Sequence, residues 1–259
     1  MVIFRSSDAA RLAWAIATDD LMPFSCTALI FQLSGCLVDF GARTLPVALQ
    51  RLHPEHAGKP VAGTPQQALE ACLGKPATAA QLQALEQALG EVAGAHAELT
   101  PGAGELLQIL HDNGTPCAWL DHLPADASLR LAQALPAFIE AVTTAQTRPW
   151  PAPESCWQAL TQLGVERLEG CIVVSGNPSL LQAGLNAGCW TIGLAACGPL
   201  CGQAPADWQA LEAIEQERLR AEATLQLYRL GAHSVVDHLG EIKASLEDIG
   251  MRRSKGEKP

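Results

Sequence analysis

The sequence predicts an α/β protein built on a doubly wound parallel sheet, and three features support this fold class. Short apolar runs recur along the chain, with the lengths typical of buried strands. Helix-forming segments separate most of these runs, as in parallel β-α-β units. The chain has 259 residues, of which 48% are hydrophobic, so it is long enough for one core domain that carries a smaller inserted one.

Six apolar runs bounded by turn-forming residues are the predicted strands. They comprise residues 27–33, 115–120, 138–143, 171–175, 191–195 and 234–237. Helical patterns precede three of them, at 103–111, 154–163 and 180–187. Residues 208–230 are expected to form one long, partly exposed helix, and the basic, polar tail 251–259 is expected to be poorly ordered.

The segment between the first and second predicted strands has helix-forming runs, such as 79–89, but no convincing strand. This pattern predicts a small helical cap inserted after the first strand. The predicted division is an N-terminal extension over 1–26, a core domain formed by 27–44 and 100–259, and a shortened cap over 45–99.

Composition excludes several classes of partner. The formal net charge of -10, with acidic and basic residues mixed, gives no electrostatic reason to expect nucleic acid or an anionic membrane surface. Charged residues between Asp8 and Asp20 interrupt every apolar run near the N-terminus, so neither a signal peptide nor a membrane span is expected. Nine scattered cysteines match neither a disulfide scaffold nor a zinc site, so we expect reduced thiols, a cytoplasmic location and no metal.

Candidate site residues follow the ends of the predicted strands, because open parallel sheets bind ligands beyond the carboxyl ends of their strands. Four segments qualify, namely 32–39, 121–124, 148–154 and 175–180. The polar pocket candidates within them are Gln32, Ser34, Asp121, His122, Arg148, Ser175 and Asn177.

Residues 29–41 read Leu-Ile-Phe-Gln-Leu-Ser-Gly-Cys-Leu-Val-Asp-Phe-Gly, which resembles the opening motif of phosphonoacetaldehyde hydrolases in the haloacid dehalogenase superfamily. Further matches occur in the right order at 97–103, 151–153, 184–193 and 231–237. The resemblance covers most of the chain from residue 27 onward, and only the inserted region matches poorly. It implies a haloacid-dehalogenase-type core with a Rossmann-like sheet.

The resemblance implies that an aspartate at the end of the first strand attacks phosphorus. Gln32 stands at that position, and Ser34 follows where most of the superfamily has an acid/base aspartate and this subfamily a small residue. A neutral carboxamide is a far weaker nucleophile than a carboxylate and a poor Mg²⁺ ligand. Two interpretations of Gln32 stay open: its amide bonds the loop backbone, or it contacts a ligand.

The other motifs also depart from the family pattern. Asp121 stands where the family has a phosphate-holding Ser or Thr, and Trp150 where it has a cation. Gly176 and Leu180 stand at the positions of magnesium-binding aspartates, beside Ser175. The resemblance therefore implies a magnesium requirement whose ligands are missing here, and we expect no cofactor.

Simpler interpretations accompany three of these side chains. Asp121 is favoured as the N-cap of a helix over 125–135, and His122 as a solvent-facing loop residue. Arg148 is either a solvated loop residue or a cation that reaches a rebuilt pocket. The family also uses a cap lysine that forms a Schiff base, but the best register places Ala62 there rather than Lys59.

These departures together predict a non-catalytic paralogue that keeps the fold and a pocket for a small-molecule ligand, in a binding or regulatory role. The alternative is a hydrolase of altered chemistry that acts on a small phosphorylated or phosphonate-like metabolite. Its candidate reacting groups are Asp121, His122, Arg148 and Ser34. A remnant with little function is a third possibility. The resemblance also implies a homodimer, because family members pair through cap helices.

Overall fold

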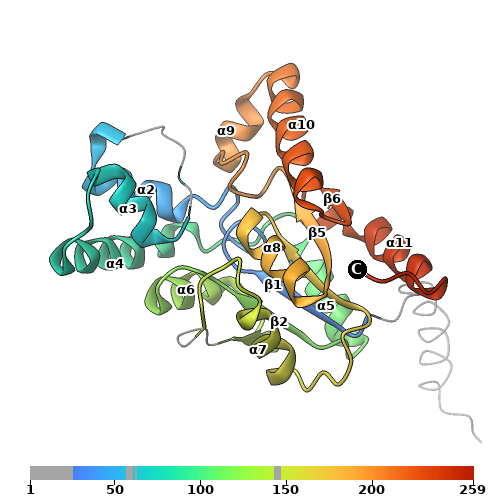
Figure 1. The fold of residues 1–259 in the computed structure, drawn as a ribbon. Helices are drawn as coiled ribbons and strands as arrows, with labels where there is room; N and C mark the ends of the chain where they lie inside the picture. Colours follow the sequence, from blue (N-terminus) through green and yellow to red (C-terminus); the bar gives the residue numbers. More distant parts are fainter. Residues whose placement is uncertain (1–25, 57–60, 62, 143–146) are drawn as a thin grey trace, which may run out of the picture.

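The computed structural model describes residues 26–56, 61, 63–142 and 147–259 (Figure 1). The predicted N-terminal extension therefore lies outside the described residues except for Cys26, and Lys59 and Ala62 lie outside them as well. No helix in the described ranges combines the length and the apolar character that a membrane crossing requires.

Six parallel strands form a single sheet in the order β3-β2-β1-β4-β5-β6. They are β1 (Ala28–Gln32), β2 (Cys117–Leu120), β3 (Glu140–Ala141), β4 (Cys171–Ser175), β5 (Trp190–Leu194) and β6 (Ser234–Val236). Each strand coincides with a predicted one to within two residues at its ends. The order reverses between β1 and β4, because later strands extend the sheet in both directions. The predicted doubly wound fold is confirmed.

The two faces of the sheet bury alternate residues of β1, as the period of a strand requires. Leu29 and Phe31 belong to a core that includes α5 (Ala103–Asp112) and α11 (Ile242–Ser254). Their neighbours Ala28 and Ile30 belong to a core on α7 (Glu154–Gln162) and α8 (Pro178–Ala187). Helices on both faces explain why the strands are uniformly apolar.

The insertion after β1 is helical, as predicted (Figure 1). It contains α2 (Thr44–Leu52), α3 (Pro65–Leu73) and α4 (Ala79–Ala93), with 3-10 turns at Pro54–His56 and Gly94–His96. Thr64 and Thr78 form capping boxes that start α3 and α4. Helix α4 packs on α2 and on α6 (Ala125–Leu131) of the core. The cap boundaries at residues 45 and 99 stay a prediction.

The single helix predicted over 208–230 is wrong. The chain forms α9 (Pro205–Ala210) and α10 (Ala213–Leu230), because the backbone is extended at Leu211 and Glu212. Gln216 stabilises this break, since its Nε2 donates to the carbonyls of Trp208 and Leu211 at 2.7 and 3.3 Å. The Gln216 amide thus bonds carbonyls at the end of α9 and within the break.

The tail over 251–259 is more ordered than predicted, because α11 continues to Ser254. The Arg252 guanidinium lies 4.7 Å from the centroid of the Trp190 ring, and its Nε donates to Glu257 at 2.9 Å. A cation over an aromatic face contributes roughly 0.5–2 kcal/mol. This contact attaches the last turn of α11 to the core.

Candidate functional site

The carboxyl ends of β1 and β4 lie side by side at the point where the strand order reverses. Ligands of open parallel sheets bind at such a point. A cleft of about 960 Å³ opens there between the strand ends and the inserted helices. From the core, its lining includes Gln32, Ser34, His122, Leu123, Asn177 and Ser179. From the insertion, its lining includes Leu45, Leu49, Gln50, His56, Val61 and Ala68.

The Gln32 amide is fixed in one orientation. Its Oε1 accepts from the Ser175 hydroxyl at 2.5 Å and from the Asn177 backbone N–H at 3.1 Å. A backbone N–H only donates, so the atom that faces it must be the amide oxygen. Gln32 is fully buried, and no described group accepts a hydrogen bond from its Nε2. The amide therefore bonds the loop backbone, and its Nε2 donor is left without a partner among the described residues.

Asn177, whose N–H donates to Gln32, lies at the start of α8. Asn177 is the N-cap of α8, because its Oδ1 accepts from the Ser179 N–H at 2.8 Å. Gly176 meets the chain closely, since a Cβ there would lie 2.4 Å from the Gly198 Cα. Leu180 is fully buried in the core on α7 and α8. Gly176 and Leu180 thus occupy packing positions.

The Asp121 carboxylate closes a turn after β2. Its Oδ1 accepts from the backbone N–H groups of His122 at 2.8 Å and Leu123 at 3.4 Å, and its Oδ2 has no partner among the described residues. The predicted N-cap role is wrong, because the N-cap of α6 is Pro124, without a side-chain cap. Asp121 instead lies in the turn that precedes α6. Burial raises the pKa of Asp121 to about 7.

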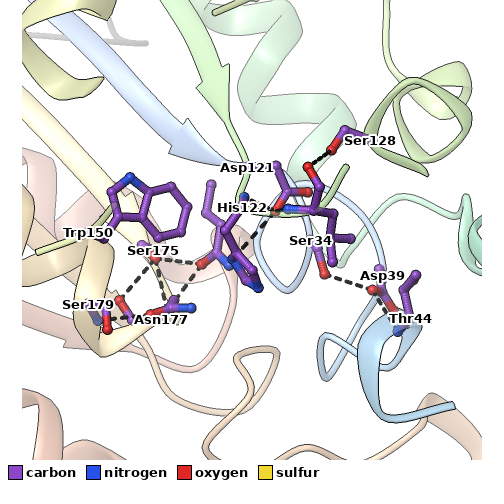
Figure 2. Close-up of polar contacts among 12 residues, drawn as sticks. Ser34, Asp39, Thr44, Asp121, His122, Ser128, Trp150, Ser175, Asn177 and Ser179 are labelled. Atoms are coloured by element: carbon purple, nitrogen blue, oxygen red, sulfur yellow. Dashed lines mark hydrogen bonds and ion pairs between the residues drawn. The ribbon is translucent and has the colours of Figure 1, made fainter. Parts of the chain in front are cut away.

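His122 is not the solvent-facing residue that the sequence predicts. Its side chain is 15% exposed, and its ring lies edge-on to Trp150, with 5.4 Å between the ring centroids (Figure 2). Burial lowers the pKa of His122 to about 4, so the ring is neutral at pH 7. Its Nδ1 lies 3.7 Å from Asp121 Oδ1, which is too far for a hydrogen bond.

Trp150 and Arg148 lie outside the cleft lining. Trp150 donates from Nε1 to the Ser155 hydroxyl at 2.9 Å, and its ring packs against the ring of His122. Arg148 forms an ion pair with Glu154, and its side chain is 75% exposed. The structure therefore matches the interpretation of Arg148 as a solvated loop residue.

Asp39 organises a second cluster beside the cleft (Figure 2). It is buried, and its carboxylate accepts from the Ser34 hydroxyl at 2.7 Å and from the His96 ring at 3.1 Å. The N–H groups of Arg43 and Thr44, where α2 begins, add bonds of 2.8 and 3.1 Å. Asp39 thus joins both ends of the insertion. Sequence reasoning did not select His96, although it directly precedes the motif at 97–103.

The side chains at the strand ends do not fit a magnesium site. Mg²⁺ requires near-octahedral oxygen ligands, usually with one or two free carboxylates. The Asp39 carboxylate already accepts from four donors, and Asp121 is held in the turn after β2. Within the described ranges, no three His, Cys, Asp or Glu side chains gather in a way that could hold a metal ion.

Comparison with curated proteins finds phosphonoacetaldehyde hydrolases. The chain is 35% identical over 109 residues to the enzyme of Klebsiella pneumoniae, and 35% identical over 112 residues to that of Salmonella typhimurium. Each match covers 42% of this chain and 40% of the relative, so it spans less than half of the relatives' length. No family model matches the chain.

Solved structures match over most of the chain. One crystal structure is 46% identical, with a TM-score of 0.70, and the match covers 91% of this chain and 100% of the chain in that structure. A phosphonoacetaldehyde hydrolase-like protein from Oleispira antarctica is 24% identical, with a TM-score of 0.78 and coverages of 90% and 96%. A haloacid-dehalogenase-family hydrolase from Deinococcus radiodurans, solved with phosphate and sodium, is 21% identical, with a TM-score of 0.57 and coverages of 87% and 97%. The latter two share the fold.

Proposed function

We propose that this member of the haloacid dehalogenase superfamily, on its phosphonoacetaldehyde hydrolase-like branch, binds a small molecule and does not transfer a phosphoryl group. The observation that carries this proposal is the fixed amide of Gln32 at the end of β1. The Oε1 atom already accepts two hydrogen bonds, and a neutral amide is a poor nucleophile. An acyl phosphate cannot form at this position by the route that a carboxylate uses.

The groups around Gln32 support the same proposal. A phosphate dianion beside Asp121 would meet a buried carboxyl that is half ionised at neutral pH. Trp150 contributes no charge, and Arg148 is paired with Glu154 at an exposed position. Phosphate monoesters and phosphonates are therefore poor ligands for this pocket.

A second candidate function is a hydrolase of altered chemistry that acts on a small phosphorylated or phosphonate-like metabolite. The observation that favours it is the pair formed by Asp121 and His122. A carboxyl with a pKa near 7 is suited to general acid/base work at neutral pH. Asp121 would then be the group that exchanges a proton with the substrate or with water.

We make two further proposals, on the cellular location of the protein and on its partners. The acidic chain and its free cysteines, all nine of which lie in the described part, support a cytoplasmic location without nucleic-acid or membrane partners. The homodimer that the resemblance implies stays a prediction.

A turnover assay tests the proposal. The purified chain is incubated with phosphonoacetaldehyde and with a panel of phosphate esters, with and without Mg²⁺, and released phosphate is measured. We expect no release above a protein-free control. Magnesium-dependent turnover would contradict the proposal. Magnesium-independent turnover that disappears in Asp121→Asn, but persists in the exposed control Asp126→Asn, would support the altered hydrolase instead.

A further inference from the structure

We infer that the strand-end cleft takes an uncharged ligand, whose carbonyl oxygen accepts a hydrogen bond from Gln32 Nε2 and whose apolar tail lies against the inserted helices. The inference rests on the proposed binding function and specifies the chemical class of its ligand. It assigns to Gln32 the role of an anchor for a neutral head group.

The anchor is the free amide donor. The hydroxyl of Ser175 and the N–H of Asn177 hold Oε1, so the amide cannot rotate to hide Nε2 without losing both bonds. Nε2 is fully buried and lacks a protein partner among the described residues. A buried donor left without an acceptor costs about 1–3 kcal/mol. A ligand that supplies a carbonyl oxygen removes this cost when it binds.

The surroundings of the anchor select against an anion. His122 lines the cleft as a neutral ring, and the Ser34 hydroxyl is directed to the Asp39 carboxylate. Among the described residues that line the cleft, Arg43 carries the one permanent positive charge, and its Nη1 donates to the Gly202 carbonyl at 2.7 Å. A phosphate or carboxylate head group at Gln32 would lose its hydration beside the neutral groups of Ser175 and Asn177, which supply no compensating charge.

The walls of the cleft accommodate an apolar tail. Many of the described lining side chains are aliphatic, and they come from α2, the loop before α3, α3 itself, the turn after β2 and the loop that precedes α9. They include Leu45, Leu49, Val61, Ala68, Leu123 and Leu200. The volume of about 960 Å³ is ample for a chain of about six carbons, each methylene of which contributes about 0.8 kcal/mol when buried. A neutral carbonyl compound with such a tail satisfies both the donor and the walls.

Three molecules with the same tail test this inference, namely hexanamide, hexanoate and hexyl phosphate. Each is titrated into the ¹⁵N-labelled chain, and the side-chain amide resonance of Gln32 is followed by NMR. We expect hexanamide to bind at least about tenfold more tightly than either anion and to shift this resonance. Gln32→Met should weaken the binding of hexanamide about tenfold, since it removes the donor at nearly constant volume.

The matched control is Gln83→Met, the same replacement at an exposed position of α4 outside the cleft lining, which should leave the binding of hexanamide unchanged. The ¹⁵N spectra of both variants report whether they keep the fold. The inference is overturned if hexyl phosphate binds more tightly than hexanamide, if hexanamide does not bind, or if Gln32→Met and Gln83→Met have equal effects. ³¹P NMR of the hexyl phosphate sample distinguishes the two proposals: conversion to hexanol and phosphate contradicts the binding function itself, whereas tight binding without conversion overturns only the ligand class.

Discussion

Two clusters of buried polar side chains lie at the same end of the sheet, and they differ in how completely their hydrogen bonds are made. In the cluster around Asp39, four donors satisfy the carboxylate, and the Thr44 hydroxyl beside it has no partner among the described residues. The second cluster consists of Gln32, Asp121 and His122, at the ends of β1 and β2. In it, the atoms Gln32 Nε2, Asp121 Oδ2 and His122 Nδ1 have no partner among the described residues. Buried polar groups are normally paired, so unpaired ones indicate a ligand, an ordered water or a functional role. The first cluster supports the fold, and we propose that the second belongs to a binding site.

The largest effect on stability is expected in the first cluster. Asp39→Asn replaces an oxygen that accepts two hydrogen bonds by an NH₂ group, which then faces donors. We expect the free energy of unfolding to fall by about 3 kcal/mol, measured by urea denaturation. The α2–α4 insertion should also loosen, because Asp39 holds Arg43 at the start of α2 and His96 at the far end of the insertion. A loss below about 1 kcal/mol would contradict the structural role of this cluster.

The pH dependence of stability sharpens the description of the second cluster. The pKa of Asp121 rises from 3.8 to about 7 on folding, so the folded state holds a proton that the unfolded state releases. This group makes the free energy of unfolding fall as pH rises from about 4 to 7. The pKa of His122 falls from 6.5 to about 4, so its contribution rises with pH between about 4 and 6.5. The two slopes oppose each other.

Replacement of Asp121 or His122 should therefore reveal the pH dependence of stability that the other residue contributes. We compare the change in the free energy of unfolding from pH 4.5 to pH 6.5. For Asp121→Asn, this change is expected to be about 2 kcal/mol more favourable than for the unmodified chain. His122→Gln is expected to show the opposite trend over the same range. Urea denaturation at several pH values measures both variants. Parallel pH profiles for the two variants and the unmodified chain would show that neither group is buried in its neutral form.

A smaller effect is expected from Gln32→Met. The replacement removes the acceptor for Ser175 and Asn177, but it also removes the buried Nε2 that lacks a partner. These contributions offset each other, so we expect a stability loss of less than about 1 kcal/mol. Urea denaturation beside Asp39→Asn provides the comparison. An equal loss in the two variants would remove the distinction between the clusters.

Much of the fold could be predicted from the sequence, because short apolar runs and intervening helical patterns are local signals. The break between α9 and α10 could not, since the charged and apolar alternation continues through Leu211 and Glu212. Its cause is the contact of Gln216 with carbonyls of the preceding turn. The order of the tail likewise depends on a contact with Trp190, more than sixty residues earlier in the chain.

The position of the site could also be predicted, whereas the state of its side chains could not. Strand-end logic brings Gln32, Ser175 and Asn177 together, as the structure shows. The burial of Asp121 and His122 depends on Trp150 and on the turn that precedes α6, which no local pattern encodes. Burial is what keeps His122 neutral at pH 7 and raises the pKa of Asp121.

The central claim is that the site is adapted throughout to binding, and does not merely lack a nucleophile. Gln32→Asp tests this claim most directly, by phosphate release from phosphonoacetaldehyde with saturating Mg²⁺. We predict no release above that of the unmodified chain, because Asp121, Trp150 and Gly176 would still stand where the resemblance implies a phosphate clamp, a cation and a metal ligand. Robust magnesium-dependent release from this single variant would contradict the account.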